Sequence, residues 1–226
     1  MPSSRPFRTI GAELLSFLLA ADCAGCGSPE TLLCDDCREA IRPRPVDVRT
    51  PGGLPVRASL PFESVAARCI RRLKDEGETL LARPLGASLG AVLRDTAGTG
   101  TKALAVPVPT SRSSFRRRGY RVPELLLRHA GAEPTRLLST ERGGADQREL
   151  GVAQRARNVH GRMWSTRRGR GRPVILVDDI VTTGATLDEA ARALDVAGFR
   201  VVAAVALAAT PRHSERTVNT SETRSK

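Results

Sequence analysis

The segment from Val174 to Leu187 constrains this chain more than any other, because it has the pattern of a buried strand, two adjacent acids, a turn and a helix. The aliphatic run at 174–177 is apolar on both faces, as a strand inside a parallel sheet must be. Asp178 and Asp179 then fall at the carboxyl end of that strand, where α/β proteins bind their ligands. The segment therefore predicts a ligand site at the edge of a parallel sheet.

Two neighbouring carboxylates repel each other, so a partner is expected between them. A vicinal diol, or a diol with a Mg²⁺ ion, suits two carboxylates, because hard cations prefer oxygen ligands. The following turn leads into a helix predicted from Ala185 to about Ala197, and its backbone N–H groups converge where a phosphate would bind. The turn consists of Thr182, Thr183, Gly184, Ala185 and Thr186. The alternative is an ordinary α/β strand with an acidic stretch before its helix.

A second pattern lies near the N-terminus, where four of the five cysteines form two C-x-x-C pairs separated by seven residues. Four thiolates on two tight turns match a closed, tetrahedral zinc site with a structural role. Two disulfides or an iron–sulfur cluster are the alternatives, and disulfides would need an oxidising compartment. The predicted ligands are Cys23, Cys26, Cys34 and Cys37, whereas Cys69 is expected to be a buried thiol on an apolar helical face.

An apolar run at 14–21 follows two arginines and superficially resembles a signal peptide. The flanking acids Glu13 and Asp22 argue against that interpretation, and eight apolar residues are too few to span a bilayer. We expect a short amphipathic helix at 7–20 that packs on the cysteine module. The protein is therefore predicted to be cytoplasmic, without membrane insertion.

The composition indicates anionic partners of some kind. The net charge is +12, and nearly all of the positive charge is arginine because only three lysines occur. Arginine favours bidentate phosphate contacts, although a background bias in composition would produce the same excess. Only seven aromatic residues occur in 226, which leaves little for stacking bases in a nucleic-acid channel.

The rest of the chain alternates between helical and extended patterns. Apolar residues at helical spacing occur at 65–73, 81–93 and 123–130, and strands are expected at 103–108, 135–138, 174–177 and 201–207. Strands that alternate with helices predict a doubly wound parallel sheet in an α/β fold. The predicted units are an N-terminal helix and four-cysteine finger at 1–41, a Pro/Gly-rich linker at 42–55, an α/β domain at 56–210 and a disordered tail at 211–226.

Two arginine-rich segments accompany this domain. The first leaves the strand at 103–108 and gathers five arginines within ten residues, as a pyrophosphate-binding loop would. The second, at 147–161, is polar and precedes the strand of the acid pair, where a mobile lid is expected. A solvated charged face is the alternative for both. The predicted pyrophosphate ligands are Thr110, Ser111, Arg112, Arg116 and Arg118.

The segment 178–186 resembles the ribose-5-phosphate signature of the type I phosphoribosyltransferases, which bind 5-phosphoribosyl-1-pyrophosphate (PRPP). The resemblance implies that Asp178 and Asp179 hold the ribose hydroxyls and that the turn 182–186 binds the 5′-phosphate. Over residues 14–209 the chain resembles the ComF family. The resemblance rests on the order of the four cysteines and of five motifs: Leu-Lys-x-x-Gly, Pro-Val-Pro, Arg-Arg-Gly-Tyr, Gln-x-x-Leu and Arg-x-x-Asn. Members of the family join an N-terminal zinc finger to a phosphoribosyltransferase domain, here 56–210. The chain departs from that pattern at 118–122, where Arg-Gly-Phe-Asn-Gln is usual, and at Met163, where an aromatic is usual.

The resemblance implies substitution at the anomeric carbon of ribose, in which pyrophosphate leaves and a nitrogenous acceptor arrives. Mg²⁺ and arginines would stabilise the leaving pyrophosphate, and Asp178 and Asp179 are assigned to catalysis. His129 and His160 receive no catalytic role, because a lone histidine is more often a packing or surface residue. The competing hypothesis is a non-catalytic protein that keeps the PRPP fold and binds single-stranded DNA and competence proteins during DNA uptake, through the basic segments 112–121 and 162–172.

Overall fold

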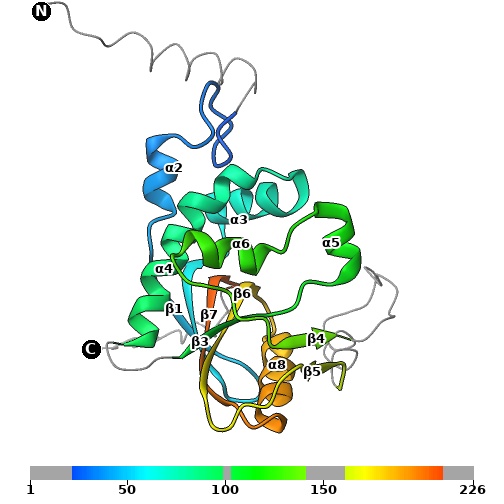
Figure 1. Ribbon diagram of the computed structural model, residues 1–226. Helices are drawn as coiled ribbons and strands as arrows, with labels where there is room; N and C mark the ends of the chain where they lie inside the picture. The colour runs from blue at the N-terminus through cyan, green and yellow to red at the C-terminus, as the bar shows by residue number, and fades with distance from the viewer. Residues whose placement is uncertain (1–21, 99–102, 141–160, 211–226) are drawn as a thin grey trace, which may run out of the picture.

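The computed structural model describes residues 22–98, 103–140 and 161–210 (Figure 1). The predicted N-terminal helix at 7–20, the predicted tail at 211–226 and all but the last residue of the predicted lid at 147–161 lie outside these residues. None of the helices within the described ranges is long and apolar enough to cross a lipid bilayer.

A five-stranded sheet forms the centre of the described residues, in the order β1-β2-β7-β6-β3. Strands β2, β7, β6 and β3 run parallel, and β1 is antiparallel to β2 at one edge. The predicted α/β fold is confirmed, with a sheet that is mixed but mostly parallel. The strands are β1 (Val46–Arg49), β2 (Pro55–Pro61), β3 (Leu104–Pro107), β6 (Pro173–Val181) and β7 (Arg200–Ala209).

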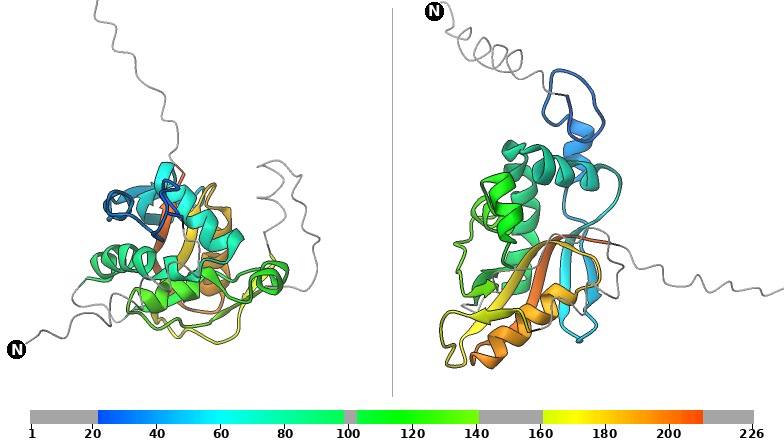
Figure 2. Two further views of the ribbon diagram at one scale, coloured as in Figure 1. Left: turned by 90° about the horizontal axis from the view of Figure 1, so that it is seen from above. Right: turned by 90° about the vertical axis from the view of Figure 1, so that its right-hand side faces the viewer.

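Helices cover both faces of the sheet, as the views in Figures 1 and 2 show. Helix α4 packs on β2 and β7, α6 packs on β3 and β6, and α8 packs on the opposite face against β6 and β7. Helices α4, α6 and α8 bury leucines against the sheet, and each fully buried leucine contributes roughly 1.5–3 kcal/mol. The helices are α3 (Ser64–Arg71), α4 (Ala82–Ala97), α6 (Val122–His129) and α8 (Ala185–Val196). The buried leucines include Leu85, Leu89 and Leu126 on one face and Leu187 and Leu194 on the other.

The segment predicted as a linker at 42–55 contains an element that the sequence analysis did not predict. Strand β1 lies within it and pairs with β2, because Val46 and Val48 turn toward the apolar core while the intervening residues face outward. The Pro/Gly-rich stretch is the tight turn between the two strands, in which the Gly53 N–H donates to the Thr50 carbonyl. Such a short alternation between prolines is easily interpreted as a linker.

Two further elements differ from the prediction. The predicted loop after β3 forms helix α5 (Arg112–Arg118), because the Ser111 hydroxyl accepts a hydrogen bond from the Ser114 N–H and caps the helix. The strand predicted at 135–138 is β4 (Leu138–Thr140), which pairs with the unpredicted β5 (Met163–Ser165) in a small second sheet. Pairing with a partner distant in sequence sets the position of β4, and local pattern carries no signal for it.

Helix α3 continues without a break into a π-helix, η1 (Arg72–Glu76). The π-helix ends at Gly77, whose φ of 78° is the left-handed conformation that glycine adopts at low cost. A short 3₁₀ turn, η2 (Thr79–Leu81), then leads into α4. Single π-turns inside α-helices often mark functional sites, because the extra residue re-aims the side chains that follow.

Candidate functional site

The acid pair lies in the second half of β6, half-buried toward the carboxyl end of the strand. The strand continues past the acids to Val181, and Asp178 lies opposite Ala206 of β7. Each carboxylate accepts the N–H of the following residue: Asp179 N–H donates to Asp178 at 2.8 Å and Ile180 N–H donates to Asp179 at 2.7 Å. These bonds fix the two side chains at the edge where a ligand was predicted.

The two acids differ in their electrostatic surroundings. Burial and then the charge of Asp179 raise the pKa of Asp178 to about 8, although the nearby Lys74 opposes the rise. Asp179 instead forms an ion pair with Lys74, whose Nζ lies 2.9 Å from its Oδ2. An arriving cation or a diol would therefore meet one acid that readily holds a proton and one that already has a counter-ion.

Lys74 is a site residue that the sequence analysis missed. It stands in the π-helix η1, far from the acids in sequence, and its side chain is 22% exposed. The sequence signal for Lys74 is the Leu-Lys-x-x-Gly segment, which indicates a functional residue only through the family resemblance.

The turn at 182–186, which was predicted to bind a phosphate and is called the phosphate turn below, leads from β6 into α8. Gly184 is the N-cap with a φ of 84°, and the Thr183 hydroxyl accepts the Ala185 N–H at 3.3 Å. Thr50 of the β1–β2 turn packs against Gly184, where an added Cβ would come within 2.9 Å of the Thr50 methyl. The neighbouring Gly52 N–H donates to Asp188 in the first turn of α8 at 2.9 Å. The unpredicted hairpin thus supports the predicted phosphate turn.

The residues predicted to bind pyrophosphate do not all lie in one place. Thr110 and Arg112 line a cavity of about 250 Å³ together with Arg121 and Arg136. Arg118 is directed elsewhere: its Nε donates to the Lys74 carbonyl, and its guanidinium lies 3.6 Å from Asp75. The structure therefore associates Arg118 with the π-helix. Ser111 caps α5, and Arg116 is exposed on it.

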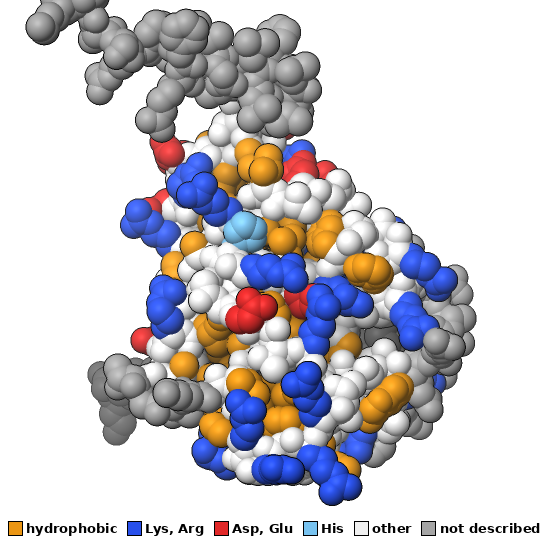
Figure 3. All heavy atoms as spheres, in the orientation of Figure 1, with side chains coloured by type: hydrophobic (Ala, Val, Ile, Leu, Met, Phe, Trp, Pro, Cys, Tyr) orange, Lys and Arg blue, Asp and Glu red, His pale blue; other side chains and the backbone are white. Residues whose placement is uncertain are grey.

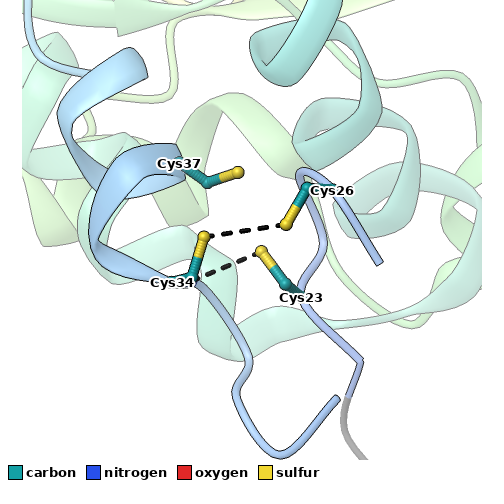
Figure 4. Close-up of side chains that lie close together, drawn as sticks. All are labelled: Cys23, Cys26, Cys34 and Cys37. Carbon is teal, nitrogen blue, oxygen red and sulfur yellow. Dashed lines mark hydrogen bonds between the residues drawn. The ribbon is translucent and has the colours of Figure 1, made fainter. Parts of the chain in front are cut away.

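The four predicted zinc ligands come together, with their sulfur atoms all within 4.8 Å of one another (Figure 4). Cys23 and Cys26 belong to one turn, and Cys34 and Cys37 lie at the start of α2 (Asp35–Ala40). The Cys26 and Cys34 sulfurs are 3.7 Å apart. Zinc–sulfur bonds of about 2.3 Å in a tetrahedron would separate the sulfurs by about 3.8 Å, so the cluster fits a zinc ion.

Hydrogen bonds prepare one of these thiols for a metal. Burial raises the pKa of Cys23, but the backbone N–H groups of Cys34, Cys26 and Gly25 outweigh it and lower that pKa to about 6. Cys69 lies outside the cluster and is fully buried, as predicted, and burial raises its pKa to about 11. Cys69 is therefore an inert thiol of the core.

The cysteine module sits on the same helix that carries Lys74. Arg68 of α3 donates to the Gly25 carbonyl, and Arg72 of η1 donates to the Asp22 carbonyl at 3.1 Å. Arg72 also pairs with Glu78 at 2.6 Å, which ties the start of the π-helix to the segment that follows it. The module is thus attached to the element next to the acid pair.

Comparison with known protein families matches part of the chain. Residues 126–225 match the phosphoribosyl transferase domain, a range that contains the acid pair and the phosphate turn but begins after Lys74 and the cysteines. The chain is therefore similar to the phosphoribosyl transferase domain over less than half of its length, and this matched part follows an N-terminal four-cysteine cluster. No curated protein matches the sequence.

Several solved structures resemble the chain. A hypoxanthine phosphoribosyltransferase from Staphylococcus aureus is 16% identical over 61% of this chain and 66% of its own, with a TM-score of 0.34. An adenine phosphoribosyltransferase is 12% identical over 76% and 89%, with a TM-score of 0.40. An orotate phosphoribosyltransferase from Aeropyrum pernix is 21% identical over 77% and 78%, with a TM-score of 0.33. The chain spans just under two thirds of the first of these, and at such TM-scores no substrate follows from the likeness.

Proposed function

We propose that this protein is a ComF-like phosphoribosyltransferase that binds PRPP with Mg²⁺ and transfers the phosphoribosyl group to a nitrogenous acceptor. The observation that supports it best is the arrangement at the end of β6, where the acid pair leads directly into a turn that is built on a left-handed glycine and opens α8. Carboxylates suit the ribose diol, and a helix start suits its 5′-phosphate.

In this proposal each part of the site has a separate task. Asp178 and Asp179 orient the ribose, and the turn Thr182–Thr186 binds the 5′-phosphate. Thr110, Ser111, Arg112 and Arg116 face the pyrophosphate, with Arg118 acting through the π-helix that it contacts. Mg²⁺ would neutralise the leaving pyrophosphate when bound. The four cysteines hold a structural zinc ion, and the protein acts in the cytoplasm.

Substitution of both acids tests the binding step. Asp178→Asn with Asp179→Asn should weaken Mg²⁺-dependent PRPP binding more than 100-fold in calorimetric titrations, because the diol loses both carboxylates. Asp195→Asn, an exposed acid near the far end of α8, is the matched control and should bind like the parent. Equal affinities for the double variant and the parent would refute the assignment.

A second experiment tests turnover and identifies the acceptor. The protein is incubated with PRPP, Mg²⁺ and a panel of nitrogenous bases while pyrophosphate is monitored. Release that depends on one class of base would identify the acceptor. PRPP binding without release with any base would favour the non-catalytic alternative.

A second candidate function is contact with single-stranded DNA, and one exposed side chain favours it. Trp164 on β5 is 47% exposed, and the exposed Arg162, Arg167 and Arg168 flank it in sequence. Figure 3 shows Lys and Arg side chains spread over one face of the molecule with few acids between them. Binding would be mainly electrostatic, so its affinity should fall steeply with salt.

Trp164→Ala should weaken binding of an oligothymidylate by about 1–3 kcal/mol if one base stacks on the indole, whereas Trp164→Phe should retain most of the affinity. Binding that is insensitive to salt and to both substitutions would exclude this surface. Competition by PRPP would instead place the contact near Arg112.

A further inference from the structure

The contact between Lys74 and Asp179 places a cation of the protein at the position proposed for the ligand's cation and diol. The ammonium lies 2.9 Å from Asp179 Oδ2, and both side chains are mostly buried, at 22% and 14% exposure. A buried ion pair is held more tightly than a surface pair, because water screens it less. Asp179 is therefore not a free carboxylate in this state of the molecule.

The backbone that carries Lys74 is held from a second element. Tyr120 donates from its hydroxyl to the Leu73 carbonyl, and Arg118 donates to the Lys74 carbonyl. Leu73 itself is fully buried in the core. These contacts fix the backbone at Leu73 and Lys74, so the fold itself sets the position of Lys74.

The chemistry of the site requires this ion pair to change when a ligand binds. Divalent cations and the ribose diol both need carboxylate oxygens, and one Asp179 oxygen already faces an ammonium. PRPP carries several negative charges, so a displaced lysine would find a new anionic partner on the ligand itself. Asp178 cannot replace Lys74 as the counter-ion of Asp179, because it carries the same negative charge when ionised.

We propose that Lys74 is the internal counter-ion of Asp179, which competes with divalent cations for the acid pair and transfers to an anionic oxygen of the ligand when PRPP binds. This inference rests on the proposed PRPP site. It assigns Lys74 as a positioning residue that opposes metal binding by the protein alone and supports binding of the metal–PRPP complex.

Lys74→Met tests the proposal, because methionine keeps an unbranched side chain of similar length and removes the charge. Mn²⁺ binding to the full chain without PRPP is measured by electron paramagnetic resonance, and Mg²⁺–PRPP binding is measured by calorimetry. The substitution should change the two affinities in opposite directions. We expect Mn²⁺ to bind at least about tenfold more tightly and PRPP to bind at least about tenfold more weakly.

Arg200→Met is the matched control. It also removes one positive charge, but Arg200 is exposed at the amino end of β7, opposite Pro173, whereas the acids pair near Ala206 and Ala208. Its affinities for Mn²⁺ and PRPP should equal those of the parent. Adding Asp179→Asn to the Lys74→Met variant should abolish the gain in Mn²⁺ affinity, since the competing carboxylate is then gone.

A variant that simply loosens the fold cannot produce tighter metal binding, so the Mn²⁺ result separates the proposal from a structural role. Unchanged or weaker Mn²⁺ binding by Lys74→Met would show that Lys74 does not compete with divalent cations for the acid pair. Tighter Mn²⁺ binding with unchanged PRPP affinity would overturn the transfer to the ligand. If the parent protein fails to bind PRPP at all, the proposed function fails, and the transfer fails with it, but the Mn²⁺ measurement still decides the competition.

Discussion

The four-cysteine cluster and the acid pair both gather groups that become negative, yet they balance the charge in opposite ways. The cysteines come from one short segment, and their sulfurs converge within 4.8 Å, so a metal ion is the natural counter-charge. The counter-charge of the acid pair is Lys74, a residue of the protein itself, which lies on a π-helix in the other half of the chain. The first site would take its counter-charge from a metal ion that the protein must acquire, whereas the second takes it from packing between distant elements.

Loss of one cysteine should produce the largest effect. Zinc binding contributes roughly 10–16 kcal/mol to folding in small zinc peptides, so Cys34→Ser should unfold the module around the cluster while α8 and the phosphate turn persist. Zinc analysis together with limited proteolysis at 23–41 measures this. Cys69→Ala, outside the cluster, should keep its zinc. A Cys34→Ser protein with full zinc and an intact module would contradict the four-ligand site.

Gly184→Ala tests how strongly packing supports the phosphate turn. The left-handed φ costs an alanine about 1–3 kcal/mol, and the new Cβ would also crowd the Thr50 methyl. Gly53→Ala is the matched control, because Gly53 has a similar φ of 86° but open space around it. We expect the melting temperature to fall further for Gly184→Ala than for Gly53→Ala. Equal losses would mean that the hairpin does not brace the turn.

Glu189→Gln tests the support of α8 from the small β4–β5 sheet. Hydrogen bonds from Arg192, and from the Met163 N–H at 2.9 Å, lower the pKa of buried Glu189 to about 2 against the opposing effect of burial. A lowered folded-state pKa contributes stability that is complete above the ordinary value near 4.5 and is lost as the pH falls through about 2.

The variant should therefore be less stable than the parent at pH 7 by about 1–3 kcal/mol, and the gap should close between pH 4.5 and 2. Denaturant unfolding across this range provides the measurement. A gap that stays constant down to pH 2 would show that the carboxylate charge is not what stabilises the contact.

Tyr120→Phe should have the smallest effect, about 0.5–1.5 kcal/mol, because it removes one hydrogen bond to the Leu73 carbonyl and keeps the ring. If the bond positions Lys74, Mn²⁺ affinity should rise slightly, in the same direction as for Lys74→Met. A stability loss with no change in Mn²⁺ affinity would show that this hydrogen bond does not position Lys74.

The same contrast explains which parts of the site the sequence could reveal. The cysteine cluster and the order from β6 through the turn to α8 are local strings, in which spacing, β-branched residues and a turn glycine carry the geometry. Both were predicted, and the helix limits agree to within one residue. Cys69 was correctly expected in the core, since its apolar helical face is also a local pattern.

Contacts between segments that are distant in sequence could not be predicted from local patterns. No local pattern predicts that Lys74 contacts Asp179 or that Thr50 packs on Gly184. The two residues of each pair are distant in sequence and come together only when the sheet folds. Arg118 illustrates the same limit: a cluster of arginines indicates anion binding, but the structure turns this one toward the Lys74 carbonyl. Its predicted contact with pyrophosphate stays a prediction.

The β1–β2 hairpin has a consequence for anyone who recombines this protein with its relatives. Its turn holds the start of α8 through Gly52 and Asp188, although the hairpin lies directly after the cysteine module in the chain. A chimaera joined after Pro55 would import a foreign β1 and turn and lose that support. A junction placed before Val46 would exchange the cysteine module but keep the β1–β2 hairpin in the same chain as the phosphate turn that it supports.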